Sequence, residues 1–211
     1  MILKRVFDIM GSIFGIILFS PIILFIAGLI KLQMPGPIIF KQYRIGRFGK
    51  PFLLYKFRTM SESHDGTSIT IKGESRITIF GAKLREMKLD ELPELWNILK
   101  GDMSFVGPRP DLPNYIDRLS ENERQFLSIR PGLTSPASIK YSNEEKLLAS
   151  VQDPYYFYDQ IIWPDKVNLN LEYYRSRSFS GDILLIIKTL VSLNADKNWI
   201  IILAIFKYFF Y

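Results

Sequence analysis

A long uncharged apolar run near the start of the chain limits its fold more than any other feature. Residues 9–30, which read IMGSIFGIILFSPIILFIAGLI, carry no charged side chain. As one helix they would extend about 33 Å, enough to cross a hydrocarbon core of about 30 Å. No small-residue cleavage site follows the run, so it does not have the pattern of a removable signal peptide. The run therefore predicts a lasting membrane element.

Two features argue against a simple transmembrane span. Ser20-Pro21 lies in the middle of the run, where Pro21 removes one helix hydrogen bond and crowds the carbonyl of Ile17. The Ser20 hydroxyl can bond a carbonyl one turn back and reinforce a bend. Both flanks are also basic, whereas a span normally has its Lys and Arg biased to one side. These residues alone leave two equal alternatives: a re-entrant helix-break-helix hairpin and a kinked span.

Positive charge is concentrated around this element. Residues 1–60 hold nine Lys and Arg against one acid, which gives +8, so the rest of the chain carries −2 of the total of +6. Such a segment suits an anionic membrane surface or a phosphate-bearing ligand. No nucleic-acid motif accompanies the charge, so we expect no nucleic-acid partner. The absence of Cys and the single His, His64, argue against thiol catalysis and against Cys- or multi-His metal sites.

The remaining sequence predicts an α+β fold, mostly helical with one small β-hairpin. Its strands are expected over 38–44 and 52–57, joined by a glycine-bearing loop. Helices are expected over 77–87, 90–100, 114–129 and 180–193, with loops over 61–76 and 102–113. The chain then divides into a membrane hairpin (1–34), a cytoplasmic domain (35–198) and an apolar tail (199–211). The tail either packs on the body or lies in the membrane interface.

The best local candidate for chemistry is the stretch from Lys88 to Pro93, which contains Asp90 and Glu91. Two adjacent carboxylates at a helix start feel the positive end of the helix dipole, which favours their ionised forms. An ionised Asp can attack phosphorus, and a neighbouring carboxylate can help to hold Mg²⁺. The structural alternative is that Asp90 caps the helix and Glu91 belongs to its first turn.

Several cations are candidates for binding phosphate. Lys56 and Arg58 are two residues apart, so on a strand they share a face that could clamp a diphosphate. A solvated basic edge is the alternative. Arg85 lies near a helix end, where a cation also stabilises the dipole. The stiff loop Gly107-Pro108-Arg109-Pro110 presents one Arg that suits phosphate or base recognition, with a structural turn as the alternative.

Taken together, these motifs resemble those of the small monotopic phosphoglycosyl transferases that initiate bacterial surface-glycan synthesis. The resemblance covers nearly the whole chain, to about residue 190. The motifs that carry it are KRVFD at 4–8, Ser20-Pro21, PGP at 35–37 with the following FKQYRIG, KFRTM at 56–60, Leu84-Arg85, LDELPELWNILKGDMSFVGPRP at 89–110 and RPGLT at 130–134.

The resemblance implies a reaction. Asp90 would attack the sugar-proximal phosphate of a UDP-sugar, release UMP and carry the sugar phosphate covalently. A polyprenyl phosphate, in particular undecaprenyl phosphate, would then take the sugar phosphate from Asp90. Glu91 would assist through Mg²⁺, held by Asp90 and Glu91, or through proton handling. The resemblance places the remaining substrate contacts at Lys56, Arg58, Arg85, Pro108, Arg109 and Arg130.

The resemblance also implies a place for the enzyme. The Ser20-Pro21 break would make the anchor re-entrant and the protein monotopic in the bacterial inner membrane, with the site on the cytoplasmic face among membrane lipid. The oligomeric state, including a homodimer, is left open. The sequence departs from the family at Ser135-Pro136, after RPGLT, and at Asn170, where many relatives have Asp. These departures bear on the identity of the sugar.

Two rival functions remain on sequence grounds. One is a non-catalytic membrane scaffold of a glycan-assembly complex, in which Asp90 only caps a helix. The other is a basic membrane-associated binder of phospholipid or nucleic acid. Neither rival needs Lys56, Arg85, Asp90, Glu91 and Arg109 together.

Overall fold

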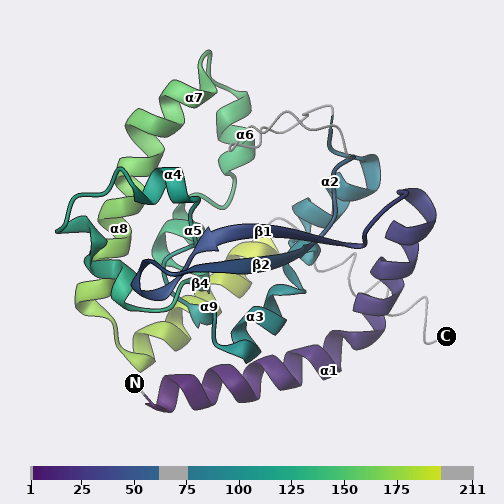
Figure 1. The fold of residues 1–211 in the computed structure, drawn as a ribbon, viewed down its shortest axis with the longest axis horizontal. Helices are drawn as coiled ribbons and strands as arrows, with labels where there is room; N and C mark the ends of the chain where they lie inside the picture. Colours follow the sequence, from purple (N-terminus) through teal and green to yellow (C-terminus); the bar gives the residue numbers. More distant parts are fainter. Residues whose placement is uncertain (1, 62–75, 196–211) are drawn as a thin grey trace.

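The structure is a computed structural model, and it describes residues 2–61 and 76–195. It shows a mostly helical body with two small β-sheets and one long N-terminal helix along its side, which confirms the predicted α+β class (Figure 1). The helices and strands are α1 (Ile2–Gln33), β1 (Ile39–Ile45), β2 (Pro51–Phe57), α2 (Ile79–Glu86), α3 (Glu94–Lys100), β3 (Ser104–Val106), α4 (Pro113–Ile116), β4 (Gly132–Thr134), α5 (Pro136–Lys140), α6 (Glu144–Ala149), α7 (Pro154–Phe157), α8 (Trp163–Ser176) and α9 (Phe179–Ala195). Three 3₁₀ turns (Arg47–Gly49, Leu89–Glu91, Glu123–Ser128) and one π turn (Tyr158–Ile162) complete the elements.

Helix α1 contains the predicted membrane element and is bent. It runs along one edge of the body and then turns, as Figure 1 shows, with Pro21 inside it. Because Pro21 has no amide hydrogen, the carbonyl of Ile17 loses its helical partner. The Ser20 hydroxyl donates to that carbonyl at 2.8 Å instead. The predicted effect of Ser20 is therefore confirmed, although the two arms remain one continuous helix.

One stripe of α1 packs on the body over its whole length. Its buried residues are Asp8, Ser12, Gly15, Ile26 and Ile30, which recur at helical spacing. Two glycines allow close approach, because a Cβ on Gly11 would lie 2.7 Å from Phe105 of β3 and one on Gly15 would lie 3.2 Å from Leu95 of α3. Many of the other apolar side chains of α1 are exposed, among them Met10, Phe14, Ile17, Leu18, Leu24 and Phe25.

Polar contacts attach the N-terminal arm of α1 to the body. The Lys4 ammonium pairs with Asp182 of α9 and donates to the carbonyl of Val106 at 2.8 Å. The Arg5 guanidinium donates to two carbonyls in the last turn of α3. The Asp8 carboxylate accepts from the Ser104 hydroxyl and the Phe105 amide of β3, at 3.0 and 3.1 Å. These charges therefore bind protein groups.

The β-hairpin follows the prediction closely. β1 pairs antiparallel with β2 in the register Ile39↔Phe57 to Ile45↔Pro51. The turn places Phe48 in the left-handed region at φ 60°, and Gly49 follows at φ 70°. The C-terminal arm of α1 packs on the far end of this hairpin, where Ile26 and Ile30 join a cluster that contains Phe57.

Two sequence predictions for the middle of the chain are wrong. The expected loop over 102–113 contains β3, which pairs in parallel with β4. The strands come so close that a Cβ on Gly132 would lie 2.1 Å from the Gly107 nitrogen, so both positions need glycine. The expected helix over 114–129 is broken into α4 and a 3₁₀ turn. The break occurs where the Ser120 amide and hydroxyl both donate to Glu123, as at a new helix start.

The C-terminal half packs around a separate aromatic cluster. Tyr115, Tyr158 and Trp163 lie at its centre, with Tyr115 in contact with both other rings. The predicted helix over 180–193 is present as α9, which begins one residue earlier. The predicted loop with His64 and the tail 199–211 lie mostly or wholly outside the described residues.

Candidate active site

The two candidate carboxylates lie in a tight turn between α2 and α3. Residues Leu89–Glu91 form a 3₁₀ turn that follows Lys88, whose φ of 56° reverses the chain. Helix α3 starts only at Glu94, and neither the turn nor α3 has a side-chain cap. Asp90 therefore does not cap a helix, and the structural alternative considered for it is not observed.

Glu91 is the centre of an ion-pair cluster. The Lys56 ammonium at the end of β2 lies 2.8 Å from Glu91 Oε1, and the Arg109 guanidinium pairs with the same oxygen. Lys56 also lies 3.2 Å from Glu94 Oε1 in the first turn of α3. The structure thus brings together three predicted residues, Lys56, Glu91 and Arg109, with a fourth, Glu94, that the sequence analysis did not single out.

Burial and neighbouring charges shift the pKa values of Asp90, Glu91 and Glu94 in different directions. Burial alone would raise the pKa of Glu91, but Arg109 and Lys56 outweigh it and hold the pKa well below its usual range. Burial raises the pKa of Glu94 to about 7, against the opposing charge of Lys56. Burial also raises the pKa of Asp90, with Lys56 opposing and the Glu91 charge adding to the rise. The cluster therefore contains one carboxyl group with a lowered pKa, Glu91, and two with a raised pKa, Asp90 and Glu94.

Asp90 is buried but makes no hydrogen bond or ion pair with any described residue. It is 6% exposed, and its Oδ1 has no hydrogen-bond partner. A buried carboxylate without a partner is costly, so such groups are rare away from functional sites. Asp90 therefore has an oxygen available to a ligand, which is what a nucleophile or a metal ligand requires.

Arg85, in the last turn of α2, is the fourth predicted residue near Asp90. Its positive charge lowers the pKa of Asp90, so it lies within electrostatic reach. Its guanidinium, however, pairs through a terminal nitrogen with Glu145 of α6. Its buried Nε has no partner among the described residues. Arg85 thus has one donor without a described partner, and Asp90, on which its charge acts, has one acceptor without a partner.

Three other predicted residues lie in structural contacts. Buried Arg58 donates to the carbonyl of Met34 at 2.7 Å and so ties β2 to the end of α1. Arg130 donates through Nε to the carbonyl of Gly101, at the end of α3, at 2.8 Å. The carbonyl of Pro108 accepts from the Gly132 amide at 2.9 Å. No described contact joins these three residues to the carboxylate cluster.

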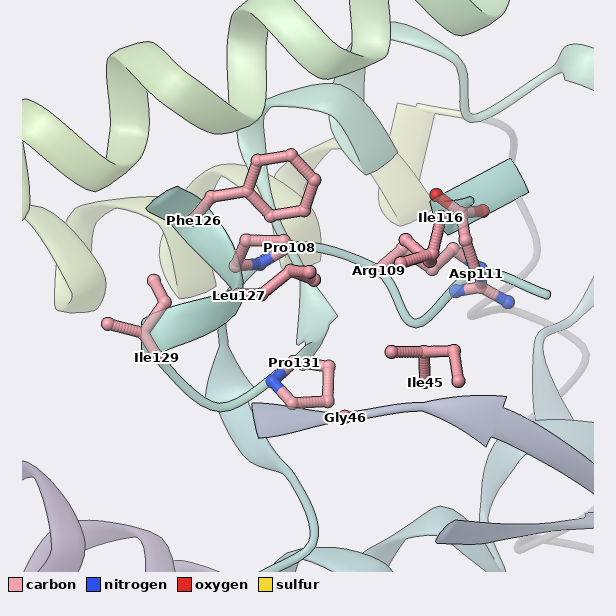
Figure 2. A pocket seen from close by; sticks show the side chains of 10 residues that line it. All are labelled: Ile45, Gly46, Pro108, Arg109, Asp111, Ile116, Phe126, Leu127, Ile129 and Pro131. Atoms are coloured by element: carbon pink, nitrogen blue, oxygen red, sulfur yellow. The ribbon is translucent and has the colours of Figure 1, made fainter. Parts of the chain in front are cut away.

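A shallow, mainly apolar pocket lies beside Arg109. Figure 2 shows Phe126, Leu127 and Ile129 on one side and Arg109 with Asp111 on the other. The remaining lining residues are Ile45, Gly46, Pro108, Ile116 and Pro131. Arg109 thus connects this pocket to Glu91.

Asp90 and Glu91 could hold a magnesium ion only together with ligands from the substrate and water. Among the described residues, no group of three or more His, Cys, Asp or Glu side chains could hold a metal. Mg²⁺ often binds through one or two carboxylates together with substrate phosphates and water. The partnerless Asp90 Oδ1 and the adjacent Glu91 fit that pattern, so any metal site here would be completed by the substrate.

Sequence reasoning missed Glu94 and Glu145. Glu94 could have been found, because it lies three residues after Glu91 and one turn further along the same segment. Glu145 gives no local signal, because it meets Arg85 across 60 residues of sequence.

Helix α1 is the one described helix that is long and apolar enough to cross a membrane. Only 17% of its most apolar window is buried in the protein. Length and composition alone also fit other kinds of helix, but a mostly exposed apolar surface does not fit a core helix.

Comparison with known proteins identifies the family. The sequence matches the bacterial sugar transferase family over residues 1–195. The chain therefore belongs to this family and is an enzyme of the bacterial phosphoglycosyl transferase class.

The alignments with individual relatives cover different shares of this chain and of the relative. An uncharacterized sugar transferase EpsL of Bacillus subtilis is 38% identical over 90% of this chain and 86% of its own. The UDP-N-acetylgalactosamine-undecaprenyl-phosphate N-acetylgalactosaminephosphotransferase of Aeromonas hydrophila is 36% identical over 77% of this chain and 41% of its own. The UDP-glucose:undecaprenyl-phosphate glucose-1-phosphate transferase of Caulobacter vibrioides is 41% identical over 65% and 53%.

Proposed function

We propose that the protein transfers a sugar 1-phosphate from a UDP-sugar to undecaprenyl phosphate through a covalent intermediate on Asp90. The observation that carries this proposal is the buried, partnerless Asp90 carboxylate amid cations that are paired with other acids. A scaffold would have no use for such a group. Relatives whose names specify UDP-N-acetylgalactosamine and UDP-glucose support a UDP-sugar donor and an undecaprenyl phosphate acceptor.

The reaction takes two displacements at one phosphorus atom. Asp90 Oδ1 attacks the sugar-linked phosphorus of the donor, and the bond from that phosphorus to the bridging oxygen breaks. UMP leaves with the electron pair, and an acyl phosphate that carries the sugar remains on Asp90. An oxygen of the polyprenyl phosphate then attacks the same phosphorus, and the Asp90–phosphorus bond breaks. No net proton transfer is needed at either step.

The neighbouring cations bind and orient the donor. Phosphoryl transfer depends on positioning and charge neutralisation, which Lys56 and Arg109 can supply from opposite sides of Glu91. The free Nε–H of Arg85 can donate to a phosphate oxygen next to Asp90. Arg109 also lines the shallow pocket, which gives the nucleotide end of the donor a place beside it. Mg²⁺, when bound by Asp90, Glu91 and the diphosphate, would neutralise part of the phosphate charge.

The anchor is proposed to be re-entrant, with the site on the cytoplasmic face of the bacterial inner membrane. Lys4 and Arg5 bind the body at one end of α1, and Ile26 and Ile30 pack on it near the other. These contacts support an anchor whose two ends lie on the same side of the membrane as the active site. A span with its ends on opposite sides of a bilayer would have to break one of these sets of contacts. The exposed apolar face of α1 then faces lipid.

The test is to look for the covalent intermediate. The purified enzyme is incubated with Mg²⁺ and a panel of UDP-sugars without acceptor, and UMP and intact protein mass are measured. One donor should release about one equivalent of UMP and add one sugar phosphate, which peptide mass spectrometry locates at Asp90. Asp90→Asn should fold and form no adduct. UMP release that requires the acceptor in every case would instead indicate direct attack by the lipid phosphate.

A further inference from the structure

Each buried or half-buried cation near Asp90 forms its ion pair with an acid other than Asp90. Lys56 lies against Glu91 and Glu94, and Arg109 pairs with Glu91. Arg85 pairs with Glu145. Lys88, which also acts electrostatically on Asp90, is exposed and so is screened by water. Asp90 is left without an ion pair among the described residues.

Of these acids, Glu145 is the one that comes from a distant part of the chain. Lys56 and Arg109 are held by acids of the Asp90 turn and the first turn of α3, whereas Glu145 lies on α6. Its carboxylate reaches Arg85 across 60 residues of sequence. The Arg85 side chain is 21% exposed and that of Glu145 is 37% exposed, so a pair here gains little stability by itself. A contact of low intrinsic value that fixes a cation next to a nucleophile points to a role in positioning.

We infer that Glu145 is a positioning residue that holds the Arg85 guanidinium away from Asp90 and so keeps the Asp90 carboxylate free to attack. This inference rests on the proposed function of Asp90. Without the Glu145 charge, the Arg85 guanidinium would lose its described ion pair and could turn toward the partnerless Asp90 oxygen, on which its charge already acts. A bidentate Arg–carboxylate pair would then occupy the oxygen that must attack phosphorus. In the observed arrangement Arg85 keeps its Nε–H for the donor phosphate.

The kinetic test uses Glu145→Gln, with Glu145→Ala as the stronger variant. The rate of the single UMP burst with UDP-sugar, without acceptor, should fall at least about tenfold, since the nucleophile is sequestered in a salt bridge. The dissociation constant for UMP, which lacks the phosphate next to Asp90, should stay within about threefold, because such a loss acts on the chemical step rather than on uniform binding. A residue that merely maintained the fold would not separate these two quantities.

Helix α6 offers a matched control. The adjacent Glu144 has its ion pair with Lys166 of α8 instead of Arg85. Glu144→Gln therefore removes one carboxylate and one ion pair from the same turn. It should leave the burst rate at the wild-type value. A Glu145→Gln burst at the wild-type rate would overturn the inference, while an adduct at Asp90 in the same experiment would leave the proposed function standing.

A second test needs no activity and is independent of the reaction. In the wild-type background, Asp90→Asn removes a buried, unpaired charge and should raise the melting temperature. In the Glu145→Gln background, Asp90 should be paired with Arg85, so Asp90→Asn should lower it. The same rise in both backgrounds would overturn the inference. If no adduct ever forms but the effect on the melting temperature changes sign, the proposed function fails and the positioning role of Glu145 stands.

Discussion

Lys56→Met should destabilise the protein strongly, because Lys56 compensates two buried carboxylates. The Lys56 side chain is 18% exposed, and those of Glu91 and Glu94 are 12% and 2% exposed. Removing one partner of a fully buried ion pair costs about 3–5 kcal/mol, and the partial exposure here reduces this to about 2–3 kcal/mol. For a chain of this size that corresponds to a fall of roughly 5–10 °C in melting temperature.

The assay is thermal unfolding in detergent, with two further variants. Glu91 keeps its pair with Arg109 when Lys56 is removed, so Glu94 is the carboxyl group left without a cation. Glu94→Gln in the Lys56→Met background should therefore recover most of the loss. Lys100→Met is the matched control, since Lys100 pairs with Asp102 at 2.9 Å but is 41% exposed. It should cost less than about 1 kcal/mol. An equal, small effect of both Lys substitutions, or no recovery by Glu94→Gln, would refute the reasoning.

Three other predictions test separate parts of the structure. Because the pKa of Glu94 is raised to about 7 in the fold from 4.5, the folded state binds more protons between these values, so stability should fall as pH rises from 4.5 to about 7. Glu94→Gln should remove that component of the slope, as measured by melting temperature against pH. Arg130→Ala should lower the melting temperature and change the UDP dissociation constant little, because Arg130 contacts the end of α3. Single cysteines at Ile2 and Gln33, in a chain without native cysteine, should both react from the cytoplasmic side, and Pro21→Ala should shift some molecules to labelling of position 2 from the periplasm.

The sequence predicted those parts of the fold that depend on neighbouring residues. The β-hairpin follows from two apolar strands around a glycine-bearing turn, and the bend in α1 follows from Ser20-Pro21. Helix α3 ends at Gly101, which adopts φ 96°, as its position after Lys100 predicted. In each case the residues that determine the structure lie within one or two turns of it.

What the sequence did not reveal depends on distant partners. β3 and β4 have three residues each and pair across a long intervening segment, so neither shows a periodic pattern. The helix expected over 90–100 starts only at Glu94, because Lys88 adopts a left-handed conformation and a 3₁₀ turn follows it, so the alternative in which Asp90 caps that helix is not observed. By contrast, the pattern Ser120-x-x-Glu123 was present in the sequence and marks the place where the expected long helix breaks.

The position of the proposed nucleophile Asp90 relative to α1 follows from how α3 is held. At its C-terminal end, Arg5 of α1 donates to the carbonyls of Ile98 and Leu99. In its middle, buried Asn97 accepts from the Tyr55 amide and donates to the carbonyl of Leu53, both on β2. Helix α3 is thus bonded to the membrane helix at one end and to the strand that carries Lys56 along its side. Because the Asp90 turn is the direct N-terminal continuation of α3, the contacts that place the carboxylate beside its cations would, with the proposed anchor in the membrane, also set its height above the lipid.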